Sequence, residues 1–112
     1  MVEANDYGKR LIEKYGLRGS HFEVNAGWHG ILETLIQDLI ALGWDREVAQ
    51  VKEKFSACRF YIGNGSHAIH DRIDVFEDQS AKTCEFCGQP GSTVGKYWIK
   101  TLCTKCAEGY TS

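Results

Sequence analysis

The chain has 112 residues, of which 43% are hydrophobic, and a formal net charge of −2 at pH 7. This length fits one domain, and this apolar fraction excludes an intrinsically disordered chain. The near-neutral charge gives no sign of a strongly basic nucleic-acid-binding protein. The sequence also contains no run of eighteen apolar residues, which is the length needed to span a membrane.

The charge divides unevenly along the chain. Residues 1–81 hold nine Lys or Arg against thirteen Asp or Glu, a balance of −4, whereas residues 82–112 hold four Lys against two Glu, a balance of +2. Four thiolates around one Zn²⁺ would add a charge of about −2 and cancel that excess. We therefore expect only weak attraction of the carboxyl-terminal part to phosphate.

The first predicted element is a short helix over residues 5–15. Asn5 or Asp6 can cap it, and Gly16 can end it in the left-handed conformation. Its apolar residues recur at helical spacing: Tyr7, Leu11 and Tyr15. Residues 17–26 show no period and are expected to form a loop or a short extended piece.

The strongest helical pattern covers residues 27–42. Its apolar residues form one wide stripe of Trp28, Ile31, Leu32, Leu35, Ile36, Leu39, Ile40 and Leu42. Asn25 can cap this helix, and Gly43 followed by Trp44 fits a helix end with a hydrophobic contact beyond it. A stripe this wide predicts a core helix that is buried on more than one side.

Residues 48–62 alternate as a β-hairpin does, with strands over 48–54 and 57–62 joined around Ser56 and Ala57. The expected core-facing residues of the second strand are Cys58, Phe60 and Ile62. Cys58 is therefore expected to be a buried, inert thiol.

The outward face of this hairpin is a candidate contact surface. It would carry Lys52, Lys54, Arg59 and Tyr61, and Trp98 from the carboxyl-terminal part could join them. Basic and aromatic groups on a sheet can contact a protein or stack on nucleic-acid bases. The alternative is an ordinary solvent-exposed face, on which Lys also protects a sheet edge from aggregation.

Asn64-Gly65 predicts a turn, after which Ser66 can cap a third helix over residues 66–80. The apolar stripe of this helix is Ile69, Ile73 and Phe76. His67, His70, Asp71 and Asp74 share its surface and could hold a transition metal or perform acid–base chemistry. We favour a solvated helix face, because no partner histidine or nucleophile is evident nearby.

Four of the five cysteines form two C-x-x-C pairs, Cys84 with Cys87 and Cys103 with Cys106, separated by fifteen residues. This spacing is typical of one tetrahedral zinc ion, and disulfides, a redox dithiol and an iron site are the less favoured alternatives. Four thiolates leave no open coordination position, so we expect the zinc to be structural. Because free thiolates need a reducing compartment and no signal peptide is evident, the expected location is the cytoplasm.

The expected fold class is α+β. A small helix and β-hairpin domain over residues 1–81 would be followed by a zinc-binding unit over residues 82–112, either a four-cysteine ribbon or a short treble clef. The latter unit has too few large apolar residues to fold without a metal. No histidine follows His70, which argues against a treble-clef nuclease.

The combination of motifs resembles a family of small, functionally uncharacterised bacterial and phage zinc-ribbon proteins. The matching segments are Gly27-Trp28, Val51-Lys52-Glu53-Lys54-Phe55, Arg59-Phe60-Tyr61, Cys84-Glu85-Phe86-Cys87-Gly88-Gln89-Pro90-Gly91, Trp98 and Thr101-Leu102-Cys103-Thr104-Lys105-Cys106. Members of that family carry Gly-Gly where this chain has Ser56-Ala57, so a mirror-type hairpin turn is not expected here. The resemblance implies no activity, but it does imply a mobile-element setting.

Three functions follow as hypotheses. The first is a non-catalytic zinc protein that acts by protein–protein contact, such as a phage accessory protein that inhibits or modulates a host defence complex. The second is a nucleic-acid-binding regulator that uses the hairpin face and Lys96, Lys100 and Lys105. The third, the least favoured, is a metal-dependent enzyme built on His67, His70 and Asp74. We expect no membrane partner.

Overall fold

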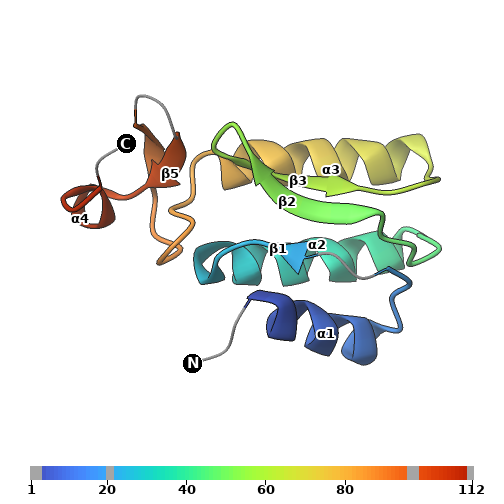
Figure 1. Ribbon diagram of the computed structural model, residues 1–112. Helices are drawn as coiled ribbons and strands as arrows, with labels where there is room; N and C mark the ends of the chain where they lie inside the picture. Colours follow the sequence, from blue (N-terminus) through green and yellow to red (C-terminus); the bar gives the residue numbers. More distant parts are fainter. Residues whose placement is uncertain (1–3, 20–21, 96–98, 111–112) are drawn as a thin grey trace.

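The computed structural model describes residues 4–19, 22–95 and 99–110 and has the α+β fold that the sequence predicts (Figure 1). Its elements are α1 (Ala4–Tyr15), β1 (Phe22–Glu23), the 3₁₀ helix η1 (Ala26–Trp28), α2 (His29–Ala41), β2 (Gln50–Lys54), β3 (Ala57–Tyr61), α3 (His67–Ser80), β4 (Ser92–Val94), β5 (Lys100–Leu102) and α4 (Thr104–Ala107). No helix among the described residues is long and apolar enough to cross a membrane.

The main sheet has the strand order β1-β2-β3. β2 and β3 form the predicted antiparallel hairpin, with Val51 opposite Phe60. β1 pairs in parallel with β2, with Phe22 opposite Val51. The segment 17–26, which has no sequence period, thus contributes a short edge strand to the sheet.

The turn of the main hairpin differs from the expectation. Its two central residues are Phe55 and Ser56, one position earlier than predicted, and both have positive φ, at 52° and 62°. Positive φ at both positions defines a mirror-type turn, so the expectation of another type is wrong. The twist of the flanking strands favours this turn, and contacts of Ser56 with the β4–β5 hairpin offset the cost of the left-handed conformation.

The predicted core helix over residues 27–42 begins as the 3₁₀ turn η1 and continues as α2. Its end is the predicted one: Gly43 has a φ of 90°, its N–H donates to the Ile40 carbonyl, and the Trp44 N–H donates to the Leu39 carbonyl. The expected cap is wrong, because the Asn25 side chain makes no capping hydrogen bond and donates to Glu85 instead.

α3 begins as predicted, with the Ser66 hydroxyl accepting a hydrogen bond from the Ile69 N–H. It also covers the outer edge of β3. The Cys58 N–H donates to the Ser80 hydroxyl over 2.7 Å, and the Phe60 N–H donates to the Glu77 carboxylate over 3.1 Å. Side chains of α3 thus satisfy edge groups that would otherwise invite pairing with another strand.

The hydrophobic core lies between the sheet and the helices α2 and α3, which cover one of its faces (Figure 1). It includes Leu32, Leu35, Ile36, Leu39, Val51, Cys58, Phe60, Ile69, Ile73 and Phe76. Cys58 is fully buried, as predicted, and desolvation raises the pKa of its thiol far above the ordinary value. It is therefore an inert core residue.

Candidate metal centre

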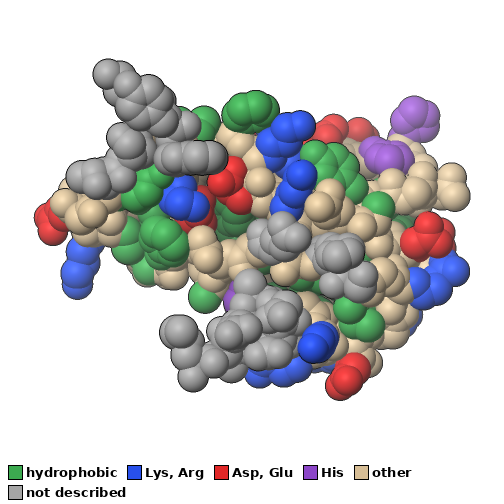
Figure 2. Space-filling model, in the orientation of Figure 1, with side chains coloured by type: hydrophobic (Ala, Val, Ile, Leu, Met, Phe, Trp, Pro, Cys, Tyr) green, Lys and Arg blue, Asp and Glu red, His purple; other side chains and the backbone are tan. Residues whose placement is uncertain are grey.

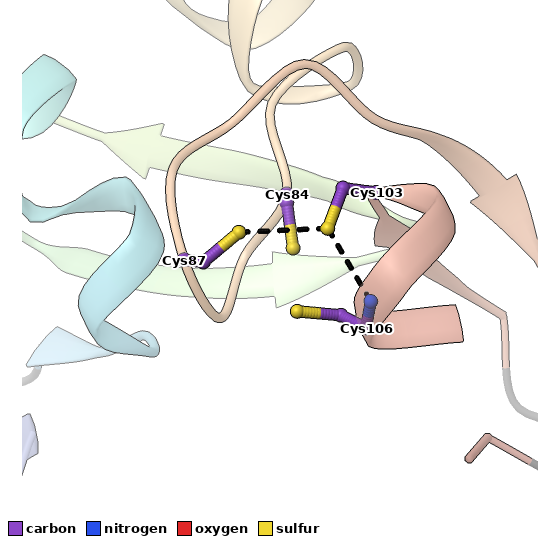
Figure 3. Close-up of side chains that lie close together, drawn as sticks. All are labelled: Cys84, Cys87, Cys103 and Cys106. Carbon is purple, nitrogen blue, oxygen red and sulfur yellow. Dashed lines mark hydrogen bonds between the residues drawn. The ribbon is translucent and has the colours of Figure 1, made fainter. Parts of the chain in front are cut away.

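Two segments bring the four paired cysteines together (Figure 3). Cys84 and Cys87 lie in the turn between α3 and β4, whereas Cys103 directly precedes α4 and Cys106 lies within it. The four Sγ atoms all lie within 4.8 Å of one another. All four cysteines are free, and the Sγ atoms of Cys87 and Cys103 are 3.5 Å apart, well beyond the roughly 2.05 Å of a disulfide.

These separations fit a single tetrahedral ion. Metal–sulfur bonds of about 2.3 Å place tetrahedral sulfur ligands about 3.8 Å apart. Within residues 4–19, 22–95 and 99–110, this is the group of potential ligands close enough to hold an ion. The cluster can therefore bind one metal ion through four sulfurs.

The first pair sits in a tight turn that backbone hydrogen bonds define. The Cys84 N–H donates to the Gln89 carbonyl over 2.7 Å, and the Gly88 N–H donates to the Cys84 carbonyl over 2.9 Å. Gly88, which follows the second cysteine of this turn, has a φ of 83°. Glycine adopts such a positive φ without steric cost, whereas other residues rarely do. The β4–β5 hairpin and α4 then return the second pair, which is the arrangement of a short treble clef.

Backbone N–H groups favour the ionised form of one sulfur in each pair. Burial alone would raise the pKa of Cys84, but N–H groups of Cys103, Cys87 and Phe86 lower it to about 6. The Cys106 N–H, 3.3 Å from the Cys103 sulfur, lowers the pKa of Cys103.

The pKa of the other cysteine in each pair is raised instead. Contacts with the thiols of Cys103 and Cys84 raise the pKa of Cys106 to about 12, and the pKa of Cys87 is also raised. Four sulfurs this close cannot all ionise by themselves. A divalent cation at their centre would stabilise all four thiolates, which is the chemistry of a metal site.

A buried carboxylate attaches the metal unit to the core, and the sequence reasoning missed it. Glu85, between the first two cysteines, is only 1% exposed. Its Oε1 atom accepts from Lys100 Nζ over 2.8 Å and from Asn25 Nδ2 over 3.1 Å. The indole N–H of Trp28 adds a second link, because it donates to the carbonyls of Ser80 and Thr83 at 3.1 and 2.9 Å. The motif segments Gly27-Trp28 and Cys84-Glu85 meet at this junction.

The histidine cluster does not form a comparable site. His67, His70, Asp71 and Asp74 are all exposed on α3. They are not among the described side chains that converge closely enough to hold an ion. The solvated helix face is the simpler interpretation of this group.

The candidate contact surface lies on the sheet face away from α2 and α3. The register places Lys52 opposite Arg59 and keeps Lys54 and Tyr61 on the same face. Basic side chains lie over these strands in Figure 2. Arg59, however, pairs with Glu77 at 3.1 Å, which leaves the two lysines as the more available cations. Trp98 lies outside the described residues.

The nucleic-acid alternative loses support from these ion pairs. Arg59 is neutralised by Glu77, and Lys100 is neutralised by Glu85 at 2.8 Å. Lys96, which that alternative also uses, lies outside the described residues. Lys105 is exposed on α4, within the metal unit. A continuous track of free cations along the sheet and the metal unit is therefore not seen in the described part of the chain.

The fold and the site define a small α+β protein with a four-cysteine metal-binding unit docked on its core. No family model, curated protein or solved structure matches this chain.

Proposed function

We propose that this chain is a non-catalytic, zinc-containing binding protein that acts by protein–protein contact. The observation that carries this proposal is the closed cluster of Cys84, Cys87, Cys103 and Cys106. Four thiolates select a soft or borderline ion, and zinc is the usual one in tetrahedral sulfur sites. Because they fill its coordination shell, the ion stabilises the fold and is closed to substrate.

The state of the cysteines supports a reducing location. All five thiols are free, including the exposed Cys87. Such thiols persist in the cytoplasm and tend to oxidise outside it. We therefore place the working protein in the cytoplasm.

The partner is proposed to contact the open sheet face that carries Lys52, Lys54 and Tyr61. Residues 1–81 have a charge balance of −4, yet this face is basic, so a protein with an acidic surface patch suits it. The resemblance to small bacterial and phage proteins adds a further proposal. In that setting the partner would belong to host machinery, such as a defence complex that the chain inhibits or modulates.

Affinity purification with the tagged, zinc-loaded chain tests this function. We expect a specific protein partner that is retained by the wild-type chain and lost with a Lys52→Glu/Lys54→Glu variant. A Cys103→Ser/Cys106→Ser variant, which cannot complete the metal site, tests whether binding depends on the metal, and it should also lose the partner. Salt-sensitive retention of an oligonucleotide, with no protein partner, would instead support the nucleic-acid alternative.

A further inference from the structure

The tip of the main hairpin carries an aromatic residue that the fold does not use. Phe55 is 71% exposed, more than any other large hydrophobic side chain in the described part of the chain. Its φ of 52° lies in the left-handed region, which a residue with a bulky side chain adopts at a cost. A mirror-type turn at this position favours Asn or Gly. Phe55 therefore adopts a costly backbone conformation while most of its side chain stays exposed.

The metal unit holds this turn in place. Ser56, the second turn residue, is buried, and its hydroxyl lies 2.9 Å from the hydroxyl of Thr93 on β4. The Ser56 carbonyl accepts a hydrogen bond from the hydroxyl of Thr101 on β5. The Thr101 carbonyl in turn accepts from the N–H of Glu85, beside the first metal ligand. With Ser56 fixed against the metal unit, Phe55 is directed outward.

The surroundings of Phe55 are basic. Lys54 Nζ lies 5.7 Å from the centre of the Phe55 ring, and Lys52 is on the same face of β2. An exposed aromatic side chain with a cationic border fits an apolar pocket that has acidic residues at its rim. Stacking on nucleic-acid bases is less favoured, because Tyr61, the other exposed aromatic residue of the hairpin, lies at the opposite end of β3 from Phe55.

We propose, on the basis of the function proposed above, that Phe55 is the anchor residue of the protein–protein contact. Its ring would insert into an apolar pocket of the partner, Lys54 and Lys52 would face acidic residues at the rim, and the metal unit would present the turn. The sequence reasoning placed the contact on the strand face and did not include Phe55.

The first test is stability, which needs no partner. We expect Phe55→Asn to raise the melting temperature of the metal-loaded chain by a few degrees, because Asn suits the left-handed turn position. Val75→Asn, at a 59% exposed helix position, is the matched control and should not raise it. A lower melting temperature for Phe55→Asn would show that Phe55 serves the fold, and would overturn the proposal.

The second test locates the contact by photo-crosslinking. A diazirine side chain replaces Gln50, which lies on the same face of β2 as Lys52 and Lys54 but has no part in the proposed contact, and the zinc-loaded chain is irradiated in an extract of the cells that contain it. Unlabelled competitors are then added: the wild-type chain, Phe55→Ala and Val75→Ala. We expect one protein adduct that wild type and Val75→Ala suppress equally, whereas Phe55→Ala requires roughly thirtyfold more protein.

Each other outcome has a defined meaning. If Phe55→Ala competes as well as wild type, the protein-binding function stands and the anchor role of Phe55 is wrong. If no adduct forms, both are wrong. An adduct that nuclease removes, or one with the mass of two copies of the chain, would replace the proposed partner with nucleic acid or with a second copy.

Discussion

The backbone N–H of Gly27 donates to the carbonyl of Glu85 over 2.8 Å, so the start of the core helix and the cysteine turn are in direct backbone contact. A Cβ atom on Gly27 would lie 2.1 Å from the Cys84 carbonyl oxygen and 2.5 Å from the Glu85 carbonyl carbon. Neither backbone atom can move without displacing the first metal ligand. The absence of a side chain at Gly27 is therefore a requirement for docking the metal unit.

We predict that Gly27→Ala lowers the free energy of unfolding by about 3 kcal/mol, because the added methyl group forces the two segments apart. Gly30→Ala is the matched control, since a Cβ there meets nothing within 4 Å. That variant should be stabilised by about 0.5–1 kcal/mol through helix propensity. Chemical denaturation of the zinc-loaded variants measures both changes, and equal effects would contradict the docking described here.

The buried carboxylate of Glu85 gives a second prediction. Lys100→Met removes its cation and leaves a charge that is 1% exposed, so we expect a loss of about 2–4 kcal/mol in unfolding free energy. Asn25→Ala removes only a hydrogen bond to the same oxygen and should cost about 1 kcal/mol. Urea denaturation compares the two variants. A larger loss for Asn25→Ala would mean that the ion pair does not stabilise this junction.

His29 predicts a pH dependence of stability. Its ring stacks on Tyr7 with centroids 3.6 Å apart, and burial lowers its pKa against a smaller opposing effect of its hydrogen bond to Val24. The unfolded chain therefore binds the proton more readily than the folded chain. The unfolding free energy should fall as pH drops through the ordinary value of about 6.5.

The control for this prediction is His29→Phe, which keeps an aromatic ring against Tyr7 and removes the titrating group. As the pH drops from about 7.5 to about 5, the unfolding free energy of this variant should fall less than that of wild type. This range spans the ordinary pKa of histidine. Denaturation midpoints at several pH values give the comparison. Metal release at low pH affects both chains equally, so identical pH profiles would rule out a contribution from His29.

Local patterns predicted most of the secondary structure. The wide apolar stripe over residues 27–42 and the Ser66 cap each depend on neighbours within a few positions, and both are found. The alternation in 48–62 likewise gave the hairpin and its core face. The two C-x-x-C pairs identified the cluster, because four sulfurs can meet only if both short turns approach each other.

Contacts between distant segments could not be predicted in this way. Nothing in residues 17–26 indicates that Phe22 pairs in parallel with Val51. The strand β1 has only two residues, which is too short to show the alternation of apolar and polar residues that marks a strand. The turn at Phe55 and Ser56 lacks the usual Asn-Gly signal and depends on hydrogen bonds to Thr93 and Thr101, far along the chain. In the sequence, Glu85 looks like an ordinary surface residue between two zinc ligands. Its burial is set by Asn25 and Lys100, which are distant in the chain.

The most direct test of the metal site is X-ray absorption spectroscopy at the zinc edge on the purified chain. We predict one zinc per chain with four sulfur neighbours at about 2.3 Å and no lighter ligand. A shell that contains nitrogen or oxygen, or a chain that carries no zinc and forms disulfides among Cys84, Cys87, Cys103 and Cys106, would contradict a closed structural site.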